Sequence, residues 1–186
     1  MTLEEIRVQI DKIDSEMKPL FLKRMECARH VAEAKAVTGG DVFVLERELA
    51  IIEKRAADVE EVHTEYVAFL RHLMSVSRRF QYGILKKMQD TVIRDALQKA
   101  GLDEEQEHKQ VKLAFTCQKE ASDLNLYLNM VQLNGIFLDQ MEVRSEDGIQ
   151  KVTLVLEGSL KEETMRRLIC QIAKEAEGFQ IISLNA

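Results

Sequence analysis

The 186-residue chain has few of the residues that make turns or cross-links. It contains one Pro, 8 Gly and no Trp, which argues against an all-β sandwich of many short strands and favours long helices. Its three cysteines, Cys27, Cys117 and Cys170, are odd in number and widely spaced, so they match neither a disulfide framework nor a zinc pattern. We therefore expect a reduced, cytoplasmic protein with no metal and no cofactor.

Long apolar runs and an excess of positive charge are also missing. Uninterrupted apolar stretches last only a few residues, as at Val67–Leu70, so no membrane span is expected. The segment from Met1 to Lys12 carries both signs of charge and lacks the apolar centre of a signal peptide. The net charge of −6 disfavours non-specific binding to nucleic acid. Neither a membrane nor a nucleic acid is an expected partner.

The composition is that of a folded protein with two units. Hydrophobic residues make up 46% and charged residues 31% of the chain, which suits a buried core. Residues 1–90 carry 15 basic and 16 acidic side chains, whereas residues 91–186 carry 11 and 16. The acidic excess therefore lies in the second part, which indicates a change of unit.

Residues 3–36 show apolar side chains at spacings of three and four, which predicts one long helix ending at Gly39–Gly40. Pro19 lies inside it, and an interior proline costs on the order of 3 kcal/mol, so we expect a kink there. A helix of about 34 residues spans roughly 50 Å, more than the width of a domain this size. Another chain must cover its apolar stripe, which predicts an intertwined homodimer.

The rest of the chain divides at a charged linker, residues 101–110. Before it, helical periodicity runs from about Phe43 to Val59 and from His63 to Gly101. After it, residues 111–186 show the order strand, helix, strand, strand, helix, strand, which is the ferredoxin-like arrangement. The signals include a period-two apolar pattern from Val111 to Cys117, a helix cap at Asp123 and a hairpin turn at Asp147-Gly148. The predicted units are residues 1–100, all helical, and residues 111–186, an α+β domain.

Several polar side chains of the helical unit fall on shared faces. Arg24 and Lys35 are eleven residues apart, which is about 20° from the same direction and about 16 Å along the axis. Arg7 lies about 100° away around the helix from Arg24, so in an intertwined dimer it would reach the partner's pocket. Ser77 and Gln81 share a face because they are four residues apart.

Arg47 and Glu48 begin the polar side of the second predicted helix. The whole set holds no nucleophile–base pair and no metal cluster. It suits an anionic ligand with carboxylates and hydroxyls, because planar guanidinium groups bind carboxylates through two parallel hydrogen bonds.

Five segments in order resemble the all-helical class of chorismate mutases across roughly the first 90 residues. They are Leu3–Asp14, Lys23–Met25, Val31–Lys35, Glu46–Glu48 and Ser77–Gln81. The resemblance implies an intertwined helical dimer that rearranges chorismate to prephenate in aromatic amino-acid biosynthesis. The reaction is a Claisen rearrangement, so it needs no covalent or proton-transfer step.

The resemblance also assigns roles to single residues. It implies that Arg24, with Arg7 from the partner chain, clamps the two substrate carboxylates and that Ser77 assists. Lys35 and Gln81 would donate to the ether oxygen, where negative charge develops. Two further residues complete the set: Glu48 would accept from the ring hydroxyl, and Arg47 would order Glu48.

Residues of about 111–186 resemble an ACT regulatory domain in the order of their elements, which makes an aromatic amino acid the candidate effector. The turn at residues 118–122 has no glycine for close backbone approach, so effector binding stays open.

Two alternatives to a mutase stay open. Val44 stands where the family often has an aspartate, and Pro19 lies within the first helix. Both features fit a non-catalytic sensor or partner-binding regulator of the same pathway. Some relatives with this helical fold eliminate pyruvate from isochorismate, so an isochorismate-pyruvate lyase is the other alternative.

Overall fold

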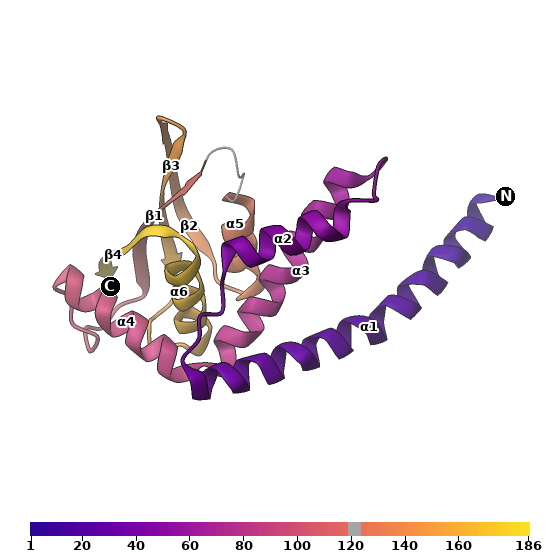
Figure 1. The fold of residues 1–186 in the computed structure, drawn as a ribbon. Helices are drawn as coiled ribbons and strands as arrows, with labels where there is room; N and C mark the ends of the chain where they lie inside the picture. The colour runs from indigo at the N-terminus through magenta and orange to yellow at the C-terminus, as the bar shows by residue number, and fades with distance from the viewer. Residues whose placement is uncertain (119–123) are drawn as a thin grey trace.

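The computed structural model describes residues 1–118 and 124–186, which form helices first and a sheet afterwards (Figure 1). The predicted turn at residues 118–122 and the helix cap predicted at Asp123 therefore lie almost wholly outside the described residues. The elements are α1 (Leu3–Thr38), α2 (Leu45–Ala56), α3 (His63–Ile84), α4 (Lys86–Ala100), β1 (Gln110–Gln118), α5 (Leu124–Leu133), β2 (Leu138–Glu146), β3 (Ile149–Glu157), α6 (Glu163–Glu175) and β4 (Glu177–Asn185). We call α1 to α4 the helical segment and β1 to β4, with α5 and α6, the sheet unit.

Helix α1 is a single long helix that extends away from the rest of the chain (Figure 1). Its first turn is closed by a capping box, in which the Glu5 amide donates to Thr2 Oγ1 and the Thr2 amide donates to Glu5 Oε2. It ends at Gly39, whose φ of 76° is left-handed and favours glycine. The helix continues through Pro19 without a break, and it bends along its length (Figure 1).

The helical stretch predicted from His63 to Gly101 is divided in two at Leu85, so the expectation of one continuous helix is wrong. Leu85 has a non-helical ψ of 63° and is buried beside Val42, Tyr82 and Cys170. No proline lies at this break. The position of the break is instead determined by the burial of Leu85 against other elements. The chain changes direction here, and α4 packs on α6 and β4.

The sheet unit contains a four-stranded sheet in the order β2-β3-β1-β4, with every neighbouring pair antiparallel. The predicted hairpin turn joins β2 to β3 through Asp147 and Gly148, whose φ values of 49° and 79° are both positive, as a type I′ turn requires. Alternate residues of β1 point into the core, as the period-two pattern predicted. Val111, Leu113 and Phe115 are all buried there.

Helix α4 contributes to the same core as the sheet. Its Ile93 and Leu97 are buried in one hydrophobic cluster with Leu113 and Leu154 of the strands. The packing therefore joins α4, the last helix before the predicted boundary, to the sheet unit. The division into units ending at residue 100 and beginning at residue 111 stays a prediction.

The charged stretch predicted as a linker is fixed against the sheet unit. His108 is buried, and its Nε2 accepts a hydrogen bond of 2.8 Å from the Leu160 amide. The Lys109 amide donates to the Asn185 carbonyl at 2.7 Å. These two hydrogen bonds hold the segment between α4 and β1 against the sheet unit. No helix in the described part of the chain is long and apolar enough to cross a membrane.

Candidate active site

A cavity of about 230 Å³ lies among α1, α2 and α3, and we call it the cation pocket. Six of the seven site residues predicted from the sequence line it: Arg24, Lys35, Arg47, Glu48, Ser77 and Gln81. They come from three helices and from positions up to 57 residues apart along the chain. Apolar side chains, among them Val42, Val44 and Met74, complete the wall.

Arg24 is held in the pocket by α3. Its Nη1 donates to Ser77 Oγ and, at 3.4 Å, to the Leu73 carbonyl. Ser77 is one turn after Leu73 and also donates to that carbonyl at 3.1 Å. Burial, followed by the nearby Arg55, lowers the pKa of Arg24, yet a guanidinium stays charged at any ordinary pH. Ser77 thus orients a permanent cation.

Lys35 supplies a second positive charge on the same side of α1. Its Nζ donates to the Val42 carbonyl at 3.3 Å. Burial, followed by the charge of Arg47, lowers its pKa below the ordinary lysine value. The positive charges of Arg24, Lys35 and Arg47 repel one another in this pocket. A bound anion would offset that repulsion.

Gln81 lies one turn after Ser77 on α3 and is buried. Its Oε1 accepts no hydrogen bond from any of the described residues. A buried amide oxygen without a partner costs free energy, so this side chain is suited to a polar ligand in the pocket.

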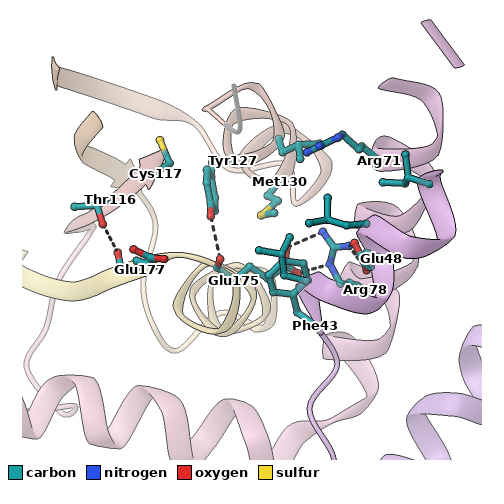
Figure 2. A pocket seen from close by; sticks show the side chains of 14 residues that line it. Phe43, Glu48, Arg71, Arg78, Thr116, Cys117, Tyr127, Met130, Glu175 and Glu177 are labelled. Carbon is teal, nitrogen blue, oxygen red and sulfur yellow. Dashed lines mark hydrogen bonds and ion pairs between the residues drawn. The ribbon is translucent and has the colours of Figure 1, made fainter. Parts of the chain in front are cut away.

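Glu48 on α2 is the only carboxylate among the residues that line the cation pocket, and it has a partner that the sequence analysis missed. Arg78 Nη1 donates to both of its oxygens, while Arg78 Nε and Nη2 each donate at 2.8 Å to Glu175 of α6 (Figure 2). Arg78 belongs to the segment Ser77–Gln81 that carried the family resemblance, but no role was assigned to it. Glu175 is 97 residues away, so no spacing rule could have found the pair.

Arg7 lies outside the cation pocket of its own chain, near the exposed start of α1. Its Nη1 forms an ion pair with Glu4, one turn earlier, at 3.7 Å. Seventeen residues of helix separate it from Arg24, which is about 25 Å along the axis. Any part that Arg7 takes in binding must therefore involve a second chain.

The pocket offers a hydroxyl, an amide, one carboxylate that is already paired with Arg78, and three further cations, Arg24, Lys35 and Arg47. Such a set binds an anion through charge-assisted hydrogen bonds, and no pair of its side chains forms a nucleophile with a base. Chemistry here would depend on holding a ligand and stabilising charge that develops within it.

Comparisons with known proteins match the part of the chain that forms this pocket. The family model "Chorismate mutase type II" matches residues 6–82, which include all seven predicted site residues. The T-protein of Haemophilus influenzae is 34% identical over 59 residues, or 32% of this chain and 16% of the T-protein. The chain thus covers about a sixth of that relative. No solved structure matches the chain. Residues 6–82 are therefore similar to chorismate mutase type II domains, and they include the α1, α2 and α3 residues that line the cation pocket.

Proposed function

We propose that this protein is a chorismate mutase, which rearranges chorismate to prephenate in the biosynthesis of aromatic amino acids. The observation that carries the proposal is the convergence of Arg24, Lys35, Glu48, Ser77 and Gln81 on one cavity within the matched domain. These residue types fit chorismate, which has two carboxylates, a ring hydroxyl and an ether oxygen.

In this proposal the carboxylates are bound by guanidinium groups. Arg24, oriented by Ser77, binds one carboxylate, and Arg7 of a second chain binds the other. Such contacts hold the flexible side chain of chorismate over its ring, in the conformer from which the new C–C bond can form. Fixing that conformer in advance removes an entropic part of the barrier.

The charge that develops during bond breaking falls on the ether oxygen. Lys35 and Gln81 donate to it, and a fixed donor stabilises the transition state more than the substrate. Glu48 accepts from the ring hydroxyl, and Arg47 lies beside it at the mouth of the pocket. No protein group forms a bond to the substrate or transfers a proton.

A homodimer is part of the proposal, because α1 has an apolar surface that its own chain leaves open. Leu3, Ile10 and Met17, which are seven residues apart and share one stripe, are 64%, 50% and 47% exposed, more than a soluble monomer usually tolerates. A further cavity of about 680 Å³ opens between α1 and α3 and has mostly apolar walls, among them Met17, Leu20, Phe21, Phe69 and Leu73. A second α1 packed there would cover both features.

The direct test is turnover of chorismate by the purified protein, followed by the appearance of prephenate. Isochorismate assayed in parallel separates the mutase from the lyase alternative, since only a lyase would release pyruvate from it. A folded dimer that converts neither substrate would contradict the enzyme and favour a sensor or partner-binding regulator.

Activity should depend on the charge of Lys35. Because burial and Arg47 lower its pKa below the ordinary 10.5, kcat/KM should fall at alkaline pH with a midpoint below 10.5 as the ammonium is lost. The substrate carboxylates favour the ammonium, so kcat should persist to higher pH than kcat/KM. Turnover measured against pH checks this. Lys35→Arg keeps its charge and should lack the fall, whereas the same alkaline limb in both proteins would mean that another group titrates.

We further infer that the sheet unit is a ferredoxin-like, ACT-like regulatory domain. Its element order and its strand order β2-β3-β1-β4 support this inference. Phenylalanine, tyrosine and tryptophan, each added to the turnover and thermal-unfolding assays, test it: an effector should shift the rate or the melting temperature. Three inert amino acids would contradict amino-acid sensing. A cytoplasmic location belongs to the same proposal, since all three cysteines are free thiols, as is usual in a reducing compartment.

A further inference from the structure

We propose that Glu175 of the sheet unit is a positioning residue for the cation pocket: it holds Arg78 so that Glu48 keeps acceptor positions available for the ligand hydroxyl. The inference rests on the proposed function, since it assigns Glu48 to the ligand. It makes the sheet unit a structural part of the active site.

The three nitrogens of the Arg78 guanidinium are divided between two carboxylates. Nε and Nη2 donate to the two oxygens of Glu175, each at 2.8 Å, which is the parallel two-bond arrangement. Only Nη1 is left for Glu48, and it donates to both Glu48 oxygens. A carboxylate has about four lone-pair positions, so this arrangement leaves positions on Glu48 unoccupied.

Glu48 and Arg78 also form the wall between two cavities. One is the cation pocket, and the other is a cavity of about 110 Å³ between the helical segment and the sheet unit, lined in addition by Phe43, Tyr127 and Glu175 (Figure 2). Glu48 therefore has one side toward the ligand and the other toward Arg78.

The arrangement is buried and fixed from several sides. Arg78 is 4% exposed, the Glu175 side chain 3%, and the Glu48 side chain 20%. Gln171 Nε2 donates to Glu175 Oε1 at 3.1 Å, and the Arg78 guanidinium lies 4.7 Å from the centre of the Phe43 ring. Burial alone would lower the pKa of Arg78, but Glu175 and then Glu48 raise it, so the guanidinium stays charged.

The charge balance explains why the second carboxylate matters. Arg78 offers one positive charge to two negative ones, so Glu48 is only partly neutralised. Without the Glu175 charge, Arg78 can turn toward Glu48 and bind it through two nitrogens, the geometry that guanidinium and carboxylate prefer as a pair. Glu48 would then be neutralised and its acceptor positions would be occupied.

The sheet unit sets this geometry through α6. Gln171 lies one helical turn before Glu175 on α6. Its Nε2 donates to the Ser75 carbonyl of α3 at 3.3 Å. The position of α6 on α3 therefore fixes where Glu175 stands relative to Arg78. A change in how the sheet unit packs on α3 would therefore reach Glu48 through Glu175 and Arg78.

The test is the steady-state kinetics of Glu175→Gln with chorismate. We expect KM to rise about tenfold, the size of one hydrogen bond to a charged group. We expect kcat to change by less than about threefold, because a contact equal in the ground and transition states affects KM alone. The ether-oxygen contacts of Lys35 and Gln81 do not involve Arg78. A role only in folding would instead lower kcat through a smaller active fraction and leave KM unchanged.

Two further variants make the result specific. Glu163→Gln removes an exposed α6 carboxylate that pairs with Lys86 of α4, and it should leave both constants unchanged. In a protein that already carries Glu48→Gln, adding Glu175→Gln should have no further effect on KM, since Glu175 acts through Glu48.

The outcomes separate the two proposals. A wild-type protein without turnover would overturn both the proposed function and this inference. An active wild type, together with an unchanged KM in Glu175→Gln or an equal rise in the Glu48→Gln background, would overturn only the inference. If Glu175→Gln does not fold, as judged by circular dichroism, Glu175→Asp replaces it: its shorter side chain keeps the charge but cannot make both hydrogen bonds to Arg78, which frees a nitrogen for Glu48, so KM should still rise, by less than tenfold.

Discussion

Replacement of Arg24 with alanine should lower kcat/KM for chorismate by about 10²- to 10³-fold, the usual loss when one preorganised charge contact is removed from an active site. Arg24 is the cation of α1 that α3 anchors in the pocket, through Ser77 and the Leu73 carbonyl. Alanine removes the guanidinium and with it the hydrogen bond from Arg24 to Ser77.

Two comparisons show whether this loss belongs to the pocket. Arg24→Lys keeps the charge but not the planar fork, so its kcat/KM should lie between those of the wild type and Arg24→Ala. Arg94→Ala removes an exposed arginine of α4 that pairs with the adjacent Asp95, outside the cation pocket, and should leave kcat/KM unchanged. Turnover of Arg24→Ala within threefold of the wild type, as a folded protein, would refute the assigned binding role.

Mixing two inactive variants should restore about a quarter of the wild-type activity, if each site of a homodimer takes Arg24 from one chain and Arg7 from the other. Arg7→Ala and Arg24→Ala are each expected to be nearly inactive alone. In a mixed dimer both lesions fall on one site, and the other site is intact. Random exchange makes half of the dimers mixed, each with one of two sites working.

The matched control uses two substitutions at residues that the same chain contributes to each site. Arg24→Ala mixed with Lys35→Ala leaves every site with one damaged residue, so activity should stay at the level of the parents. Subunit exchange is verified separately, with a mass tag on one variant. Exchange without recovered activity in the Arg7→Ala mixture would contradict the contribution of Arg7 across the dimer.

The sequence predicted much of the cation pocket because its residues lie on regular helices. The eleven-residue spacing places Arg24 and Lys35 on one side of α1, and the four-residue spacing does the same for Ser77 and Gln81. The family resemblance brought the three helices together, and the match to the chorismate mutase type II family model confirms it over residues 6–82. Periodicity also identified every strand of the sheet unit and the Asp147-Gly148 hairpin turn.

The sequence by itself therefore determined the local elements and the faces of the helices, because these depend on fixed repeats of the backbone, and with the family resemblance it identified six of the residues that line the pocket. Only the tertiary structure decided where the helix from His63 ends, since the burial of Leu85 has no local signal. It alone also joined Arg78 to Glu175 across 97 residues. Contacts between distant segments depend on how whole elements pack, and neither spacing nor residue type along one helix contains that information.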